Sequence, residues 1–421
     1  ENCFSSTQGT LLSNAPLHDQ DLTIEGSEGR SKVGLVNILE MNNDRPTDKQ
    51  EMISLAHSAG CCVEFLFESK KNKVHSSFFL SKGRASELQM HCKKSCVELV
   101  IFSEPLSPIQ QRNLTLFLKC RVIDRVALIL DIFANRARTK EGKLQVEMAQ
   151  LKYLSTRLVR GWSHLERQRG GIGLRGPGET QLETDRRLIA KRVRRLNDQL
   201  ARFSDQCRNR RKSRKKRGAY NVSLVGYTNS GKSTLFNVFT KADVYAANQL
   251  FATLDTTTRR VFLEDRNYIV LSDTVGFIKD LPHTLIESFK ATLSEAVNAD
   301  LLIHVIDRSD CLWEQKFRDV IEVLEEVGTE NIPMINMFNK IDLIGGEPGV
   351  RRDQYGRIQD VYASAETKNG LDLLKKAISE QKDLREKCYY PADDSTKCES
   401  QSAELDDCLK ENYSPKRESL F

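Results

Sequence analysis

Residues 32–137 alternate short apolar runs with amphipathic stretches. The apolar runs have the length of strands or, for the last, of a strand or a short helix: 33–38, 63–67, 78–80, 97–102 and 126–130. Apolar residues recur at helical spacing in three stretches: 47–59, 84–95 and 108–119. This alternation predicts a small α/β domain over 32–137. The preceding residues 1–31 are polar, and we expect them to be disordered.

The pattern changes over residues 138–217, where two long stretches carry apolar residues at helical spacing among many charged ones. The first covers about 142–168 and the second about 179–217, so we predict a long helical hairpin. The connection at its tip, 169–178, contains six Gly or Pro residues in ten, which excludes regular structure. Composition alone fits a flexible linker, but helix connections are usually shorter and seldom hold two aliphatic residues and two arginines.

Residues 218–385 again alternate strand-like runs with helical segments. The runs lie at 220–225, 260–263, 268–272, 301–306, 333–338 and 360–363. This pattern predicts a doubly wound, mostly parallel sheet with one antiparallel strand next to the second strand. The tail, 386–421, is polar and poor in apolar residues, so we expect it to be disordered.

Charge is concentrated in one segment. The whole chain of 421 residues has a formal net charge of +6, yet 184–217 alone holds 15 Lys and Arg against 3 Asp, a net charge of +12. Its densest part, 208–217, directly precedes the first strand of the 218–385 domain. Such a run binds the phosphates of nucleic acid or forms a solvated linker, with nuclear targeting as a weaker alternative.

Several classes of protein are disfavoured by composition. No apolar run approaches the roughly 20 residues of a membrane span. The 11 cysteines lack zinc-ligand spacing, and we interpret them as reduced thiols. We expect a cytoplasmic monomer, or a protein of the mitochondrial matrix if a presequence precedes Glu1.

Three motifs in one order indicate a nucleotide site. Gly226-Tyr-Thr-Asn-Ser-Gly-Lys-Ser233 is a complete G-x-x-x-x-G-K-S phosphate loop between a predicted strand and a predicted helix. Asp273-Thr-Val-Gly276 and Asn339-Lys-Ile-Asp342 each follow a later strand-like run. Open α/β sheets bind ligands at the carboxyl ends of their strands, so the three motifs are expected to meet there. Together they predict a GTPase that needs Mg²⁺.

Each motif has a physical role. Backbone N–H groups of the loop surround the β-phosphate, Lys232 reaches the β and γ oxygens, and the Ser233 hydroxyl is a Mg²⁺ ligand. We expect Asp273 to hold Mg²⁺ through a water and the Gly276 N–H to contact the γ-phosphate. Thr253, in the predicted first switch, should bind Mg²⁺ and sense the γ-phosphate, with its neighbours Thr256 and Thr257 as alternatives. Lys232, Thr253 and Gly276 are therefore the expected catalytic residues.

The third motif selects the base. A carboxylate such as Asp342 accepts hydrogen bonds from N1–H and the exocyclic amino group of guanine, whereas adenine would leave a buried Asp342 unpaired. The Lys340 stem lies along the purine and Asn339 ties its loop to the phosphate loop. The full set of expected GTP contacts is Gly226, Tyr227, Thr228, Asn229, Ser230, Gly231, Lys232, Ser233, Thr234, Phe251, Ala252, Thr253, Asp273, Thr274, Val275, Gly276, Asn339, Lys340, Asp342, Ser364 and Ala365.

Phe277 occupies the position where many GTPases place a water-orienting Gln. A phenyl ring cannot hydrogen-bond water, so we expect slow hydrolysis until a partner completes the site. His283 and His304 are polar residues available nearby, but His304 lies in an apolar run and is expected to be a satisfied core residue.

The chain resembles the HflX family of translational GTPases. The resemblance covers about 33–380 and rests on 106–114, 122–125 and 131–139, on Gly171-Ile-Gly-Leu-Arg-Gly-Pro-Gly-Glu-Thr-Gln-Leu-Glu-Thr-Asp-Arg-Arg187, and on 226–237 and Leu250-Phe-Ala-Thr-Leu-Asp255. Asp255-Thr256 departs from the Asp-Pro usual in the family, which we expect to matter little.

The resemblance implies a GTPase that binds the large ribosomal subunit and splits stalled or idle ribosomes under stress. It also implies that the hairpin tip contacts ribosomal RNA near the peptidyl-transferase centre, and RNA is bound largely through phosphate, 2′-OH and shape. The expected RNA contacts are Arg169, Ile172, Leu174, Arg175, Arg210, Arg211, Lys212, Arg214 and Lys215.

Three other functions fit part of the sequence. The first is a GTPase that acts on large-subunit assembly instead of mature ribosomes. The second is an ATP-dependent RNA remodeller that holds a second nucleotide near Lys82-Gly-Arg84. The third, a non-catalytic switch for a protein partner, is opposed by the basic segment.

Overall fold

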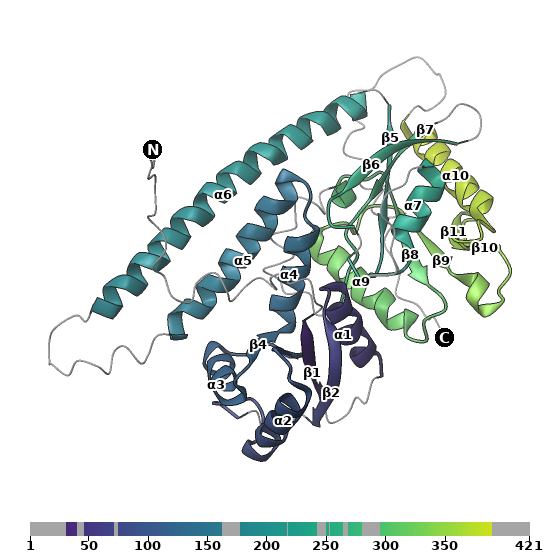
Figure 1. Cartoon of the computed structure of the whole chain (residues 1–421). Helices are drawn as coiled ribbons and strands as arrows, with labels where there is room; N and C mark the ends of the chain where they lie inside the picture. The colour runs from purple at the N-terminus through teal and green to yellow at the C-terminus, as the bar shows by residue number, and fades with distance from the viewer. Residues whose placement is uncertain are drawn as a thin grey trace, which may run out of the picture.

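The computed structural model describes residues 31–39, 46–70, 75–161, 177–216, 218–241, 250–251, 253–263, 268–279 and 295–389. They form a small α/β domain, a helical hairpin and a larger α/β domain (Figure 1). This architecture confirms the predicted fold class.

The N-terminal domain is built on a four-stranded parallel sheet. Its strands are β1 (Lys32–Leu39), β2 (Cys62–Lys70), β3 (Leu99–Phe102) and β4 (Arg121–Asp124), in the order β2-β1-β3-β4. Its helices are α1 (Pro46–Ser58), α2 (Lys82–Ser95), α3 (Pro108–Leu118) and α4 (Arg125–Arg136). Parallel strands require crossover connections, and α1, α2 and α3 supply the three between successive strands, while α4 follows β4.

Local capping explains where these helices begin. Ser107 and Gln110 form a capping box at α3, with Pro108 in its first turn. The Asp124 carboxylate accepts the Ala127 N–H at 2.9 Å and so starts α4. Because of this cap, the apolar run 126–130 is helical and not a strand, an ambiguity that periodicity cannot resolve for a short buried run.

The sequence patterns misidentified one segment of this domain and missed one of its strands. Residues 78–80 form no regular strand; they belong to a turn closed by an isolated bridge between His75 and Phe79. The fourth strand is β4, which was not predicted because it spans only four residues, of which Arg121 and Asp124 are charged.

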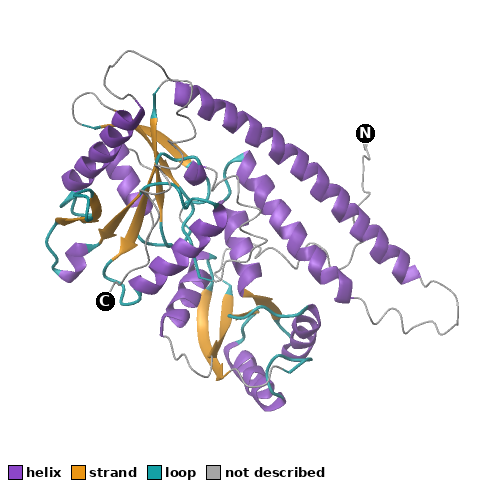
Figure 2. Ribbon diagram, turned by 180° about the vertical axis from the view of Figure 1, so that it is seen from behind, coloured by secondary structure: helices purple, strands orange, loops and turns teal. Residues whose placement is uncertain are grey.

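The hairpin consists of α5 (Lys140–Gly161) and α6 (Pro177–Lys216), which lie side by side in both views (Figures 1 and 2). At 1.5 Å per residue the 40-residue α6 is about 60 Å long. Leu196 is buried between the helices, and Arg192 pairs with Glu147 at 2.6 Å. α5 contacts the N-terminal domain as far along as Arg157, which pairs with Asp124, and α6 reaches the C-terminal domain through Arg211 and Glu295.

The C-terminal domain is a doubly wound sheet of seven strands in the order β10-β11-β9-β8-β5-β7-β6. The strands are β5 (Tyr220–Val225), β6 (Thr257–Phe262), β7 (Tyr268–Asp273), β8 (Leu301–Asp307), β9 (Met334–Asn339), β10 (Gly349–Arg352) and β11 (Ile358–Tyr362). The predicted antiparallel strand is β6, next to β7. A second antiparallel strand, β10, was missed because most of it is exposed and lacks an apolar run.

Helices cover both faces of this sheet. α7 (Lys232–Thr240) and α10 (Leu371–Tyr389) pack through Leu235, Phe236 and Ile378 on one face. α9 (Trp313–Val327) packs through Val320 and Leu324 on the other, and the short 3₁₀ helix η3 (Ile341–Ile344) follows β9.

One apolar cluster joins the two α/β domains. It contains Leu35 and Phe133 of the N-terminal domain together with Phe251 and Phe277 of the C-terminal domain. A buried apolar interface of this kind favours a fixed arrangement of the two domains over free relative motion.

Candidate functional site

The phosphate loop joins β5 to α7 and needs glycine at two positions, because a side chain there would disfavour the backbone conformation and collide with neighbouring atoms. Gly226 has φ of 149° and Gly231 has φ of 95°, which glycine adopts readily. A Cβ on Gly226 would lie 2.3 Å from the Val305 carbonyl oxygen, and one on Gly231 would lie 2.2 Å from Asn339 Nδ2. These glycines therefore permit both the turn and its close contact with β8 and β9.

Lys232 is held inside the loop. Its Nζ donates to the carbonyl oxygens of Tyr227 at 2.6 Å and Gly226 at 3.1 Å. Burial lowers the pKa of Lys232 to about 8, although nearby Asp273 acts in the opposite direction. A phosphate in the loop would favour the charged ammonium and oppose this shift.

Side-chain oxygen atoms from three separate segments meet beside Lys232. Ser233 Oγ lies 2.7 Å from Thr253 Oγ1 and donates to Asp273 Oδ2 at 2.8 Å, and Thr253 Oγ1 donates to the same Oδ2 at 3.0 Å. Asp273 is fully buried, and burial raises the pKa of its carboxyl. Hydroxyl and carboxylate oxygens are donors that Mg²⁺ prefers, so this set fits the ion.

Thr253 occupies the position beside Ser233 and Asp273. Thr257 is the first residue of β6 and pairs with Asp273 through the ladder. Ala252 lies outside the described residues.

Several buried polar atoms around the loop lack a hydrogen bond within the described part of the chain. They are Thr228 Oγ1, Ser230 Oγ and Asp273 Oδ1. Buried polar atoms are almost always hydrogen-bonded, so their concentration here is typical of a site completed by a polar ligand, water or an ion.

The Asp273-to-Gly276 motif packs directly on the phosphate loop. Thr274 Oγ1 donates to the Leu224 carbonyl at 2.6 Å. A Cβ on Gly276 would lie 2.9 Å from Thr228 Cα and 3.0 Å from Lys232 Nζ. Gly276 therefore provides the close backbone approach that its expected γ-phosphate contact needs. Val275 is buried in the interdomain cluster, so its side chain points away from the loop.

Phe277 bonds to the phosphate loop through its backbone. Its N–H donates to Gly226 O at 3.0 Å, and its carbonyl accepts the Thr228 N–H at 2.7 Å. Its side chain is buried in the interdomain cluster. The ring thus packs between domains as well as being unable to hydrogen-bond water.

Asn339 ties together the loops expected to bind the base. Its Nδ2 donates to Ser230 O at 2.8 Å and its Oδ1 accepts the Ala365 N–H at 2.9 Å. Lys340 adopts a left-handed conformation with φ of 62°, and its Nζ pairs with Asp307 Oδ2 at 2.7 Å. Ser364 and Ala365 are buried.

Asp342 differs from the expectation that it is buried. It lies on η3 and is exposed. The protein's own packing therefore does not desolvate this carboxylate, and discrimination between purines would require the base itself to cover it.

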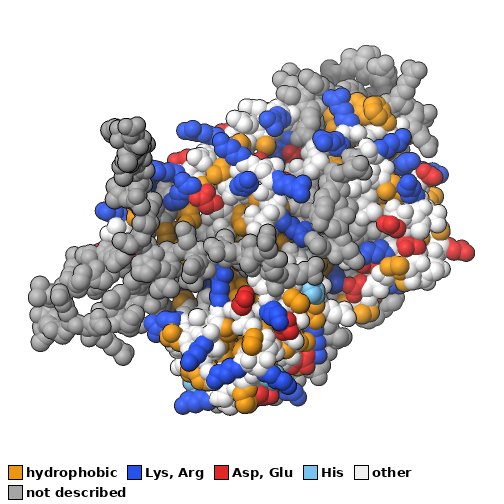
Figure 3. Space-filling view, in the orientation of Figure 1, with side chains coloured by type: hydrophobic (Ala, Val, Ile, Leu, Met, Phe, Trp, Pro, Cys, Tyr) orange, Lys and Arg blue, Asp and Glu red, His pale blue; other side chains and the backbone are white. Residues whose placement is uncertain are grey.

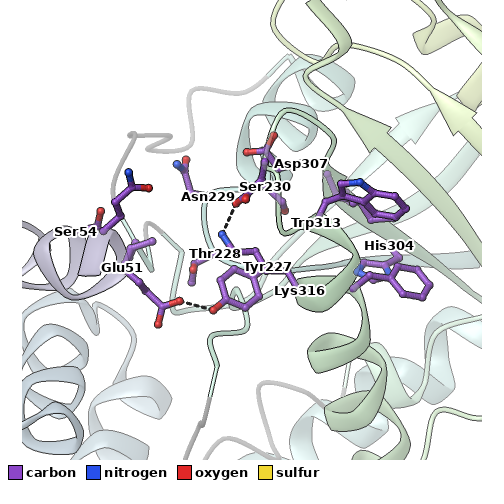
Figure 4. Close-up of a pocket in the computed structure, with 16 residues that line it drawn as sticks. Glu51, Ser54, Tyr227, Thr228, Asn229, Ser230, His304, Asp307, Trp313 and Lys316 are labelled. Carbon is purple, nitrogen blue, oxygen red and sulfur yellow. Dashed lines mark hydrogen bonds and ion pairs between the residues drawn. The ribbon is translucent and has the colours of Figure 1, made fainter. Parts of the chain in front are cut away.

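A cavity of about 190 Å³ adjoins the phosphate loop on the side of α1 and α9 (Figure 4). Glu51 of α1 accepts from Tyr227 Oη, and Tyr227 Oη accepts the Lys279 N–H at 2.9 Å. Arg125 pairs with Glu51 and donates to the Lys279 carbonyl at 2.8 Å. Sequence motifs gave no indication of this interdomain network, because its members lie far apart in the chain.

His304 also lines this cavity. It is 1% exposed and stacks on Phe317 with ring centroids 4.9 Å apart, but its Nδ1 has no hydrogen-bond partner among the described residues. His304 is a core residue, as expected, but not all of its ring nitrogens are hydrogen-bonded within the described residues. Burial lowers its pKa to about 3, with Lys232 acting in the same direction. His283 lies outside the described residues.

The hairpin residues expected to contact RNA divide into three groups. Arg210 and Lys212 are exposed on α6, and other Lys and Arg side chains line this face of the hairpin (Figure 3). Arg211 is 17% exposed and pairs with Glu295 at 3.6 Å, so it faces the C-terminal domain. Only the backbone of Arg214 and Lys215 is described, and Arg169, Ile172, Leu174 and Arg175 lie outside the described residues.

No helix among the described residues is long and apolar enough to span a membrane. The seven cysteines whose side chains are described are free thiols.

The sheet order, phosphate loop, converging oxygen donors and Asn339 linkage define the class of P-loop GTPases. Three family models match in succession: "GTP-binding GTPase N-terminal" over 47–134, "GTP-binding GTPase Middle Region" over 136–214 and "50S ribosome-binding GTPase" over 221–340.

The chain belongs to the HflX family of GTPases and is a GTP-hydrolysing enzyme. It is 50% identical to GTPase HflX of Escherichia coli strain K12 over 82% of each chain. It is 43% identical to GTPase HflX of Caldanaerobacter subterraneus subsp. tengcongensis, over 86% of this chain and 83% of that relative. Among solved structures, a GTP-binding protein from Sulfolobus solfataricus in complex with GDP matches with 25% identity and a TM-score of 0.45, over 84% of this chain and 99% of that one.

Proposed function

We propose that this GTPase associates with the large ribosomal subunit and splits stalled or idle ribosomes, and that the ribosome stimulates its slow hydrolysis. The observation that carries the GTPase part is the meeting of Ser233, Thr253 and Asp273 beside Lys232. The ribosomal part is supported by the match of 221–340 to a model described as a ribosome-binding GTPase and by the exposed basic residues of α6.

The side chains have separate roles in this proposal. Lys232 neutralises β and γ oxygens, and Gly276 offers its N–H to the γ-phosphate. Ser233 and Thr253 would hold Mg²⁺, with Asp273 contributing through a water. The ion supplies charge neutralisation and orients the phosphates when bound. Because Thr253 meets Ser233 and Asp273 from a segment outside the phosphate loop, we expect GTP to order that segment and hydrolysis to release it.

Guanine selection rests on Asp342. An Asp342→Asn variant replaces one carboxylate oxygen with an amide N–H donor, which matches the C2 carbonyl of xanthine and not the amino group of guanine. We expect this variant to lose GTP hydrolysis and gain XTP hydrolysis, with XTP and GTP titrations as the measurement. Equal use of ATP by the wild type would contradict the assignment of Asp342.

The ribosomal function is tested with purified wild-type protein and bacterial ribosomes. GTP turnover is measured alone, with large subunits and with whole ribosomes, and particles are separated by sedimentation. We expect strong stimulation and conversion of whole ribosomes to subunits, both lost when residues 170–178 are deleted. Activity on large-subunit precursors alone would instead assign the protein to assembly, and no stimulation by any ribosomal particle would reject the ribosomal function.

A further inference from the structure

The segment that carries Thr253 contacts the start of the hairpin both before and after Thr253 in the chain. We refer to residues 250, 251 and 253–255 as the Thr253 segment. Leu250, Phe251 and Leu254 are buried in the interdomain cluster with Phe133 and Ala137, at the end of α4. The Thr253 segment thus lies against the junction of α4 and α5, which is the point where the hairpin begins.

The first set of contacts is made by Phe251, which precedes Thr253 in the chain. Phe251 packs edge-on against Phe133 of α4, with ring centroids 4.6 Å apart. Arg136 Nη1 donates to the Phe251 carbonyl at 3.1 Å. Phe251 has φ of 57°, an unfavourable conformation for a bulky residue, so these contacts hold the backbone where it would not otherwise remain.

The second set of contacts is made by the carboxylate of Asp255, which follows Thr253 in the chain. Asp255 Oδ2 accepts the backbone N–H groups of Arg138 at 2.9 Å and Thr139 at 2.8 Å, and Oδ1 accepts Thr139 Oγ1 at 2.5 Å. Thr139 Oγ1 in turn accepts the Gly142 N–H at 2.9 Å. An acidic side chain at the N-terminus of a helix is also favoured by the helix dipole, here that of α5.

Gly142 shows how closely Asp255 and α5 approach. A Cβ at Gly142 would lie 2.2 Å from Asp255 Oδ1 and 3.1 Å from Thr139 Oγ1. Gly142 is the third residue of α5, where alanine would otherwise be the better helix former. The absence of a side chain at this position keeps the Asp255 carboxylate on the helix terminus.

We propose that Asp255 is a positioning residue for GTP hydrolysis: it links the start of the hairpin to Thr253, so that binding of RNA to the hairpin places Thr253 at the nucleotide. The link is short, because Asp255 is two residues from Thr253, whose hydroxyl lies within 3.0 Å of Ser233 and Asp273. This inference deepens the proposed function and rests on it for the identity of the hairpin's partner.

The mechanical basis is the rigidity of the hairpin. α5 and α6 pack along their length, and α6 returns to the C-terminal domain through the pair between Arg211 and Glu295. Among the described residues, the hairpin contacts the N-terminal domain through Tyr153 and Arg157, which both bond to Asp124. It contacts the C-terminal domain at Asp255 and Glu295. Of these hairpin contacts, the one at Asp255 lies two residues from Thr253, so a displacement of the hairpin relative to the C-terminal domain reaches Thr253 most directly through Asp255.

Two substitutions test the link without changing any residue expected to touch GTP. Asp255→Ala removes the carboxylate, and Gly142→Ala displaces it by adding one methyl group on the hairpin. The matched control is Gly83→Ala in α2, where a Cβ would meet no atom within 4 Å. Circular dichroism and thermal unfolding establish that each variant is folded.

The first readout is kinetic. We expect both variants to bind GDP within about twofold of the wild type, because the phosphate and base loops are intact. Turnover of GTP at saturating large subunits should fall about 10- to 100-fold through kcat and not KM, the loss that misplacement by about 1 Å produces. Gly83→Ala should retain wild-type stimulation.

The second readout needs no ribosome. Hydrogen exchange is followed in peptides covering 137–145 and 250–257, with GDP and with a non-hydrolysable GTP analogue. In the wild type and in Gly83→Ala the analogue should slow exchange in both peptides. In Asp255→Ala and Gly142→Ala it should slow exchange in 250–257 alone.

The two readouts separate the failure of this inference from failure of the proposed function. Absent stimulation of the wild type would reject the ribosomal function, while joint protection of both peptides would still support the link. The link is overturned if the analogue protects both peptides equally in Asp255→Ala, or if Asp255→Ala and Gly142→Ala are stimulated as strongly as Gly83→Ala.

Discussion

At the scale of single residues, the site buries charged side chains, and contacts between them offset part of the free-energy cost of removing them from water. Asp273 and Lys232 are both buried, and each moderates the pKa shift of the other. The Ser233 and Thr253 hydroxyls donate to one Asp273 oxygen and leave the other without a partner among the described residues. Buried charged groups whose hydrogen-bonding atoms are not all paired are typical of functional sites and not of stable cores.

Phe277→Gln tests whether Phe277 limits hydrolysis by itself. The Phe277 ring is buried between domains, so a glutamine there would lose apolar packing and bury an amide. We expect a loss of about 2–4 kcal/mol in the free energy of unfolding and no gain in intrinsic turnover. Urea unfolding and single-turnover hydrolysis are the measurements; a faster variant of unchanged stability would contradict this prediction.

His304 gives a pH dependence of known sign. Its pKa is about 3 in the folded protein, below the ordinary value of 6.5, so the unfolded chain binds more protons between these values. Stability from this group is therefore complete above pH 6.5 and falls as the pH drops toward 3. Between pH 7.5 and pH 5 the loss is about 2 kcal/mol.

His304→Leu should remove this loss because it removes the titrating ring. The measurement compares free energies of unfolding of the variant and the wild type at pH 7.5 and pH 5. A wild type and variant with the same pH dependence would show that His304 protonates normally in the folded protein.

At the scale of elements, the basic end of α6 has two surfaces that differ in exposure. Near its C-terminal end α6 exposes Arg210 and Lys212 to solvent but directs Arg211 to Glu295. A basic run that looks uniform in the sequence is thus divided by the helical period into residues available to a partner and one that anchors the helix.

Paired substitutions distinguish these surfaces. The double variant Arg210→Ala, Lys212→Ala should weaken binding to large subunits and reduce the slope of log K against log salt by roughly 0.7–0.9 for each lost phosphate contact. Arg211→Ala should leave that slope unchanged and lower the thermal stability. Salt titrations of ribosome binding provide the measurement, and an equal change of slope in both variants would contradict the division.

At the scale of the whole molecule, the two α/β domains share a core that includes the residues flanking the nucleotide site. Phe251, Leu254, Phe277 and Ile278 are buried with residues of β1, α1, α4 and α5. The Glu51, Arg125 and Tyr227 network adds polar contacts at the same interface. The nucleotide site is therefore supported on one side by its own sheet and on the other by the N-terminal domain.

Calorimetry tests this shared core. We expect the described domains to unfold in one transition, and a free GDP concentration of 100 times Kd to raise the free energy of unfolding by about 2.7 kcal/mol. Two transitions, of which GDP shifts only one, would show that the domains unfold independently.

The sequence by itself determined the order and type of most elements and the class of the site. Periodicity located the long helices α5 and α6 and the buried parallel strands, because both patterns are strong and local. The phosphate loop and the two later motifs identified a GTPase, because each motif encodes backbone geometry within a few residues. Weakly patterned elements such as β4, β10 and the helical run 126–130 were missed or left ambiguous.

Only the tertiary structure decided what lies against what. That Asp255 holds the start of α5, and that Phe277 and Arg211 face inward, depend on contacts between residues distant in the chain. We expected the departure of Asp255-Thr256 from the Asp-Pro usual in the family to matter little, but the sequence gave no sign of the contacts that Asp255 itself makes. The physical reason is that such contacts are selected by packing between elements, which local propensity and spacing do not specify.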